Sequence, residues 1–229
     1  MSRKIFLLDS NVLVDFYMGQ PKVTEVIRKL REERKFGKCL MFIPNYCIGE
    51  ALCAFAKKCH YEDEITEEKF KKIKWDFINE VSRDYEFKRE QQYSHIELNR
   101  YHLFNAHLVY QPAWEFMRTN QFRYKKPDNY PKIPYATDLL VIAQGIEMTH
   151  MYSEREFAIL TSDQLLIDIC EHLQTLDEKA RMKFVKKDNE DEAKTEGSNN
   201  LSFKYLTSFR YPNALNARDY KKIMEFMKQ

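Results

Sequence analysis

The chain alternates short apolar runs with helix-like segments, and this alternation restricts the possible folds more than any other feature. The run IFLL at 5–8 is apolar at every position, which is typical of a strand buried on both faces. Two later runs have the same character, and each is followed by a segment with helical spacing of apolar residues. The expected strands are 5–8, 40–43 and 157–163, and the expected helices are 11–17, 23–35, 45–58 and 164–173. The alternation predicts an α/β fold with a parallel sheet covered by helices.

From the composition we expect a soluble, intracellular protein. The 229 residues are 44% hydrophobic and 31% charged, an ordinary composition for a globular protein, and we expect a single domain over 1–229. The net charge is only +2, so the overall charge gives no reason to expect a nucleic-acid partner. The start MSRKIFLL imitates a signal peptide, but Asp9 interrupts its apolar run. We therefore expect a cytoplasmic protein with no membrane contact. The five cysteines form no CxxC pair, so we expect reduced thiols packed as small hydrophobic side chains.

Several segments lie outside the strand–helix rhythm. A long insertion at about 65–135 is expected to be helical, and the segment 186–200 contains no large apolar residue, so we expect a mobile loop there. The sequence also indicates short strands at 183–185 and 201–208, a helix at 137–148 with Thr137 as its N-cap, and a terminal helix at 218–227.

Carboxylates stand at the ends of the expected strands. Asp9 ends the first run and Asp163 ends the third. The simplest explanation is that each of them caps the helix that follows. In a parallel sheet, however, the carboxyl ends of all strands lie at one edge, where open α/β folds bind ligands. Glu50 follows the second strand on its helix, and Asp138 opens the helix at 137–148. We therefore expect these four acids to lie close together.

A cluster of four acids is unfavourable unless a cation neutralises it, because like charges raise one another's pKa values. Mg²⁺ and Mn²⁺ prefer carboxylate oxygens and keep several waters. Metals held in this way activate water and stabilise a leaving oxygen in phosphoryl displacement. The pattern therefore favours a metal-dependent nuclease.

Four segments together resemble the motifs of PIN-domain proteins: LLDSNVLVDF, IPNYCIGEAL, YATDLLVIAQG and LTSDQLL. The resemblance covers 5–56 and 135–173, and it excludes the insertion and the C-terminal part. It implies a three-layer fold with a central five-stranded parallel sheet flanked by helices, and the activity of a metal-dependent ribonuclease. It also implies that the catalytic, metal-binding acids are Asp9, Glu50, Asp138 and Asp163, supported through hydrogen bonds by Asn11 and Ser162.

The end of the insertion is basic and aromatic. The segment FMRTNQFRYKKPDNYPK at 116–132 has five basic residues against Asp128 alone. Basic side chains bind phosphates, and aromatic rings stack on unpaired bases, so this strip suits single-stranded RNA. The candidate RNA contacts are Arg118, Arg123, Lys125 and Lys126. The neighbouring aromatic residues are equally suited to the core of a helical insertion.

Two other acidic residues near these motifs are not expected to bind the metal. Asp168 lies five residues beyond Asp163, off its helical face, so we expect a solvated residue rather than a fifth acid. Asp15 is expected to have a structural role.

The first hypothesis is thus an endoribonuclease that uses Mg²⁺ or Mn²⁺ to cut single-stranded or loop RNA. A toxin-type nuclease with an antitoxin or another protein partner is one form of it, and homodimerisation is left open. The alternative is a catalytically silent PIN-like interaction or scaffold module. A phosphatase of the haloacid dehalogenase type is disfavoured, because its second acid would have to occupy position 11, which is Asn11.

Overall fold

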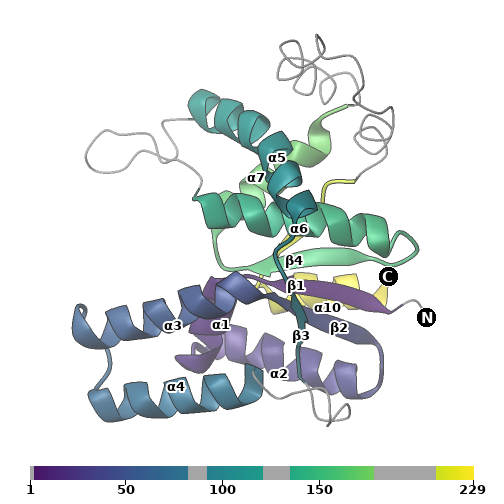
Figure 1. The fold of residues 1–229 in the computed structure, drawn as a ribbon. Coiled ribbons are helices and arrows are strands. Elements are labelled where there is room, and N and C mark those ends of the chain that lie inside the picture. The colour runs from purple at the N-terminus through teal and green to yellow at the C-terminus, as the bar shows by residue number, and fades with distance from the viewer. Residues whose placement is uncertain (1–2, 82–91, 121–134, 178–209) are drawn as a thin grey trace. The chain divides into compact units, whose positions relative to one another are not determined.

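The computed structural model describes residues 3–81, 92–120, 135–177 and 210–229. Strands and helices alternate along them as the sequence predicts (Figure 1). The strands are β1 Lys4–Leu8, β2 Cys39–Pro44, β3 Ser94–Ile96, β4 Phe157–Thr161 and β5 Asn213–Asn216. The helices are α1 Ser10–Tyr17, α2 Pro21–Lys35, α3 Asn45–His60, α4 Glu67–Val81, α5 Arg100–Thr119, α6 Ala136–Met151, α7 Gln164–Thr175 and α10 Tyr220–Lys228. The predicted loop at 186–200 and the predicted strands at 183–185 and 201–208 lie outside the described residues.

The chain divides into two compact units. Unit 1 comprises Met1–Leu98, Glu154–Gln164 and Leu215–Gln229, and unit 2 comprises Asn99–Ser153 and Leu165–Ala214. Each unit is held together by its own contacts. The predicted single domain over 1–229 stays a prediction.

The sheet has five strands in the order β3-β2-β1-β4-β5. β1 lies between β2 and β4 and is parallel to both, with Phe6 opposite Met41 on one side and Ala158 on the other. β3 is also parallel to β2. The predicted α/β class with a parallel sheet and helices around it is therefore confirmed.

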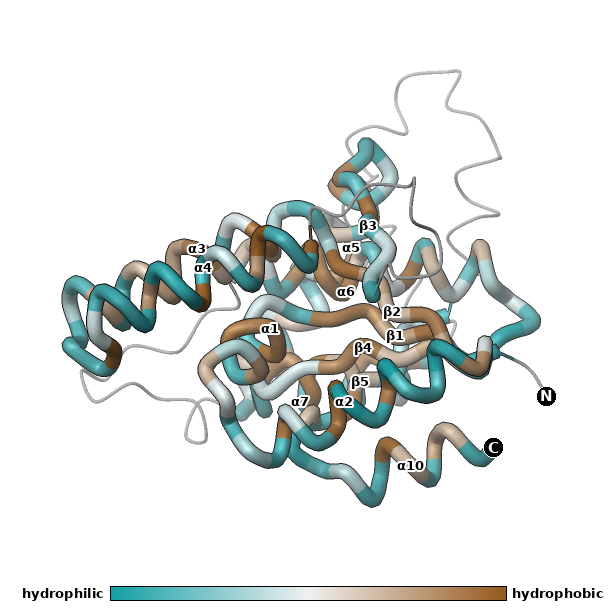
Figure 2. Tube along the Cα trace, turned by 90° about the horizontal axis from the view of Figure 1, so that it is seen from below, coloured by the Kyte–Doolittle hydropathy of each residue, from teal (hydrophilic) through white to brown (hydrophobic). Residues whose placement is uncertain are grey.

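β1 and β4, next to each other in the middle of the sheet, are buried along their whole length, which explains why nearly all of their residues are apolar. Every residue of β1 and of β4 is buried. Figure 2 shows these strands as brown, hydrophobic segments of the tube, with more hydrophilic helices outside them. The polar residues of these two strands are Lys4, whose ammonium pairs with Glu156, and Thr161 at the end of β4. The parallel pairing of β1 with β4, in which Leu8 lies opposite Leu160, places the carboxyl ends of the two strands next to each other.

The helices of unit 1 follow from amphipathic spacing and helix-ending glycines. α2 buries Val23, Val26, Ile27 and Leu30, which recur at helical spacing on one face. Gly19 and Gly37 have φ values of +80° and +71°, a backbone conformation that glycine adopts without steric cost, so they end α1 and α2. The C-terminal α10 lies against β1, since Phe226 packs edge-on against Phe6 with ring centroids 5.6 Å apart.

The expectation of a helical insertion is correct for α4 and α5 but wrong for the described residues Ser94–Ile96 between them. Ser94–Ile96 forms β3, which extends the sheet beside β2 in the register Phe42 to Ser94. Three residues are too few to show a period of two, so no strand signal could be read there. β5 was missed for the same reason, since its four residues, NALN, include only two apolar ones.

In unit 2, α5 packs against α6. α6 begins at Ala136 with Tyr135 as its N-cap, so the predicted N-cap, Thr137, is wrong by two residues. Buried His102 of α5 pairs with Glu147 of α6, which shows that a histidine in this helix is a core residue.

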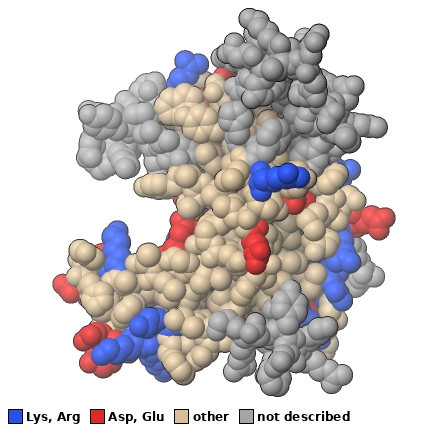
Figure 3. Space-filling model, viewed as in Figure 1, with Lys and Arg blue, Asp and Glu red and all other residues tan. Residues whose placement is uncertain are grey.

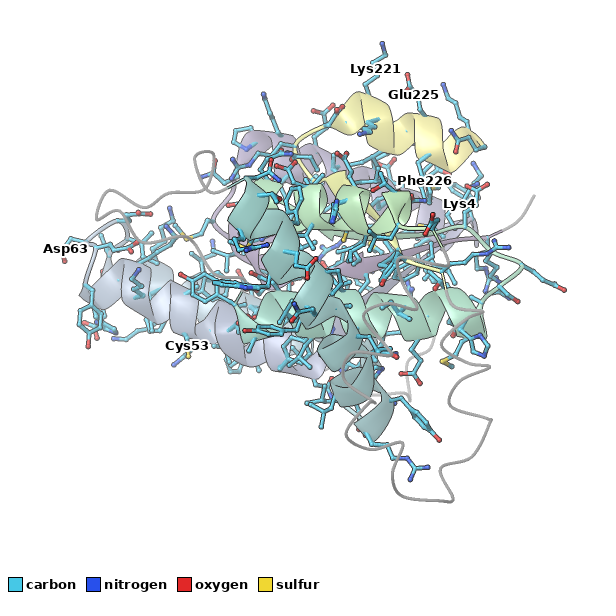
Figure 4. The ribbon with its side chains drawn as sticks, turned by 90° about the horizontal axis from the view of Figure 1, so that it is seen from above. Lys4, Cys53, Asp63, Lys221, Glu225 and Phe226 are labelled. Carbon is cyan, nitrogen blue, oxygen red and sulfur yellow. The ribbon has the colours of Figure 1, made fainter. Side chains whose placement is uncertain are left out.

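All five cysteines are free, and four of them are buried. The expectation of buried thiols is wrong for Cys53, which is exposed on α3 (Figure 4). Within the described ranges, no helix combines the length and the apolar character that a membrane span requires.

Candidate active site at the carboxyl edge of the sheet

Asp9 lies at the end of β1 and is 4% exposed. It has extended backbone dihedral angles and caps α1, because the Ser10 backbone N–H donates to Asp9 Oδ1 at 2.7 Å. Its own N–H donates to the Leu160 carbonyl at 3.1 Å, which ties this position to β4. Capping accounts for Oδ1 alone, so the other carboxylate oxygen needs a separate explanation.

Asn11 and Thr161 hold the second oxygen. Asn11 Nδ2 donates to Asp9 Oδ2 at 2.6 Å, and Thr161 Oγ1 donates to the same oxygen at 2.8 Å. Asn11 is itself oriented, since its Oδ1 accepts the Ser162 N–H at 2.8 Å. The support predicted from Asn11 is therefore present as a hydrogen bond to Asp9. Thr161 was not predicted, although a hydroxyl at the last position of the apolar run FAILT is a signal that could have found it.

The bonding pattern leaves one carboxylate oxygen able to take a ligand. Asp9 Oδ2 already accepts two short hydrogen bonds, which use both of its lone pairs. Asp9 Oδ1 accepts one short bond from the Ser10 N–H, and the Ser10 hydroxyl lies at a long 3.4 Å. A cation bound by Asp9 would thus take Oδ1.

The pKa of Asp9 is raised from 3.8 to about 6. Burial is the main cause, because it penalises the charged form. The hydrogen bonds from Thr161 and Ser10 lower the pKa, whereas the negative charges of Glu50 and Asp163 raise it further. Two acids predicted to lie near Asp9 are therefore close enough to act on its charge.

Glu50 and Asp163 reach this edge from different elements. Glu50 lies on α3, the helix that follows β2, and is half-buried. Asp163 follows β4 and is also half-buried, and its backbone N–H donates to Thr161 Oγ1 at 3.0 Å. The Thr161 hydroxyl thus connects the backbone of one acid to the carboxylate of another.

The Ser162 side chain has a partner that the sequence did not indicate. Its hydroxyl donates to Asp15 Oδ2 at 2.9 Å rather than to one of the four acids. The same Asp15 oxygen accepts a 2.9 Å bond from Arg218 Nη2. Asp15 therefore links α1, the end of β4 and the turn after β5, which agrees with the structural role expected for it.

Asp138 belongs to unit 2. It lies in the first turn of α6, where its Oδ2 accepts the Tyr135 backbone N–H at 3.2 Å. Its membership of the acid cluster stays a prediction.

Asp168, also in unit 2, is 7% exposed, so the expectation of a solvated residue is wrong. It lies on α7, whose consecutive residues from Leu165 to Cys170 are all buried.

Arg118 is exposed near the end of α5. The other three predicted RNA contacts, Arg123, Lys125 and Lys126, lie outside the described residues. On the face drawn in Figure 3, the described Lys and Arg side chains are interspersed with Asp and Glu, in keeping with the net charge of +2.

The donor chemistry fits a hard divalent cation with few protein ligands. Within the part of the chain that the structure describes, no group of three or more His, Cys, Asp and Glu side chains could by itself hold a metal ion. Mg²⁺ is usually held by one or two carboxylates and keeps several waters. Asp9 has an available oxygen and two acidic neighbours that raise its pKa, so binding a cation would relieve an existing repulsion.

Comparisons of the chain with protein-family models, with curated proteins and with solved structures found no match. The resemblance to PIN-domain proteins stays a prediction that depends on the four sequence motifs.

Proposed function

We propose that the protein is a divalent-metal-dependent endoribonuclease that hydrolyses phosphodiester bonds of single-stranded or loop RNA. The observation that carries the proposal is the buried Asp9 carboxylate at the end of β1, fixed by Asn11 and by Thr161 of β4. This arrangement costs desolvation energy that helix capping alone would not require. A functional site is the usual place for such a cost.

The residues of the chain would act mainly by positioning. Asn11 and Thr161 hold Asp9 in one orientation, with Oδ1 left for a ligand. Glu50 and Asp163 add negative charge that draws a cation to the edge. A bound Mg²⁺ or Mn²⁺ would activate a water and stabilise the leaving oxygen. Asp138 is proposed as the fourth acid, and Arg118 as one of the side chains that bind the RNA backbone.

The first test is cleavage of a fluorescent single-stranded RNA by the purified full chain with Mn²⁺, with Mg²⁺ and with EDTA. We expect metal-dependent cleavage by the wild type and a loss of about a hundredfold or more in Asp9→Asn, since electrostatic groups at a reacting centre have effects of this size. Glu50→Gln, Asp138→Asn and Asp163→Asn should also lose activity. Glu225→Gln is the matched control, because Glu225 is an exposed acid of α10 that points away from the sheet (Figure 4).

The outcomes separate the hypotheses. Equal cleavage by the wild type and Asp9→Asn would contradict the nuclease proposal. If no RNA is cut under any condition, a catalytically silent interaction module becomes the leading hypothesis. Metal-dependent hydrolysis of p-nitrophenyl phosphate without RNA cleavage would instead indicate a phosphatase.

A further inference from the structure

Arg218 lies at the same sheet edge as Asp9, although its position in the sequence is remote. It follows β5 in a turn whose backbone is fixed, since the Arg218 N–H donates to Asn216 Oδ1 at 2.9 Å. The preceding residue, Ala217, donates its N–H to the Thr161 carbonyl at 2.8 Å. The turn is therefore attached to the residue whose hydroxyl holds Asp9.

The guanidinium of Arg218 is held at one nitrogen and open at the others. Nη2 donates to Asp15 Oδ2 at 2.9 Å, and 54% of the side chain is exposed. Among the described residues, Asp15 is the hydrogen-bond partner of this guanidinium, which leaves Nε and Nη1 able to donate. Asp15 is itself fixed by Ser162 and is only 18% exposed, so it anchors the arginine firmly.

The charge balance of the edge gives such an arginine a function. Asp9, Asp163 and Glu50 make the edge acidic, and Asp15 adds a further carboxylate. An RNA phosphate that approaches this edge is repelled unless positive charge meets it. A guanidinium presents a planar fork of N–H donors that matches a phosphate, and an anchored one loses little entropy on binding.

A purely structural role for the Arg218–Asp15 pair explains less. An exposed ion pair contributes about 0 to 1 kcal/mol to stability, so it is a weak reason to fix a turn. Because its removal should leave the fold intact, the role of Arg218 in binding can be measured directly.

We propose that Arg218 binds a phosphate of the RNA strand beside the acidic site, through the donors that Asp15 leaves open. The inference rests on the proposed ribonuclease function and deepens it. Asp15 and Ser162 are positioning residues for this contact, because they hold the arginine without touching the RNA.

The test measures binding and cleavage separately. Anisotropy of a fluorescein-labelled 12-nucleotide single-stranded RNA, with Ca²⁺ in place of Mn²⁺ to suppress cleavage, gives Kd between 50 and 200 mM KCl. We expect Arg218→Gln to raise Kd about tenfold at the lowest salt and to reduce the slope of log Kd against log salt by about 0.7, the value for one single-strand phosphate contact. In cleavage with Mn²⁺, KM should rise more than kcat falls, and Arg218→Lys should restore part of the affinity.

Lys221→Gln is the matched control. It removes the same charge three residues away, from an exposed side chain of α10 that points away from the sheet (Figure 4), and Kd should stay within about twofold of the wild type. If the wild type cleaves RNA but Arg218→Gln shows an unchanged Kd and salt slope, the phosphate contact is overturned and the nuclease proposal stands. If the wild type neither binds nor cleaves RNA, the proposed function is overturned, and this inference with it.

Discussion

Two polar clusters of unit 1 differ in net charge, since one is neutral and the other is negative. In the first, Arg31 donates two 2.8 Å bonds to Glu80 and one of 2.6 Å to Tyr93, and Tyr17 also bonds Glu80. The positive charge of Arg31 is therefore balanced by the negative charge of Glu80. In the second, the buried Asp9 has neutral hydrogen-bond donors and two acidic neighbours.

The pKa values express this difference. Burial would lower the pKa of Arg31, but Tyr93 and Glu80 outweigh it and raise that pKa above its usual value, so the charge is stabilised. At Asp9 burial raises the pKa to about 6, and acidic neighbours add to the penalty. A cluster that stabilises its charge contributes to the fold, whereas a cluster that tolerates an unfavourable charge indicates a binding site.

The largest expected difference between the clusters is in pH dependence. The folded protein binds a proton at Asp9 more tightly than the unfolded chain, because its pKa rises from 3.8 to about 6. The resulting stabilisation is fully present below about pH 4 and is lost as pH rises through 6. A shift of about two pKa units corresponds to about 3 kcal/mol.

Urea unfolding of the metal-free protein between pH 4 and 7, compared with Asp9→Asn, isolates this contribution. The difference in the free energy of unfolding between the two proteins should change by about 3 kcal/mol over that range. A difference that does not vary with pH would show that Asp9 is not penalised by burial.

The next effect is on the neutralised cluster. Arg31→Met leaves Glu80 without its cation in a partly buried position, and we expect the free energy of unfolding to fall by about 2 kcal/mol, less than for a fully buried pair. Arg28→Met is the matched control on the same helix, since Arg28 is exposed, and it should change stability by less than about 0.5 kcal/mol. RNA cleavage per folded molecule should be unaffected in both. A large loss of activity in Arg31→Met would mean that the two clusters are not independent.

The smallest expected effect on stability concerns Thr161. Thr161→Val keeps the shape but removes the hydroxyl that Asp9, Asn11 and Asp163 share, at a cost of about 1 to 2 kcal/mol. The pKa of Asp9 should rise further, because the Thr161 hydrogen bond lowers it in the wild type. Cleavage should fall about 10- to 100-fold, as when a group that orients a metal ligand is lost.

Thr161→Ser serves as the control, since it keeps the hydroxyl and should retain most of the activity. Stability is measured by urea unfolding, and cleavage with Mn²⁺. Unchanged activity in Thr161→Val would contradict the role of the hydroxyl in positioning Asp9.

The sequence by itself determined the elements with strong local signals. The apolar runs at 5–8 and 157–160 predicted β1 and β4, because strands buried on both faces are mostly apolar, although the predicted end at 163 is two residues beyond the end of β4 at Thr161. The helical spacing at 23–35 predicted α2, and the parallel order placed Asp9 and Asp163 at one edge. These features depend on neighbouring residues, so they can be read along the chain.

Only the tertiary structure decided the partners of those side chains. β3 and β5 are too short to show a period, and they form because the sheet offers them a neighbour. Thr161 bonds Asp9 across 152 residues and Arg218 bonds Asp15 across 203, and no local pattern records such a pairing. The sequence showed which acids end the strands. The Thr161 hydroxyl and the Arg218 guanidinium reach these acids only because strands from distant parts of the chain end side by side.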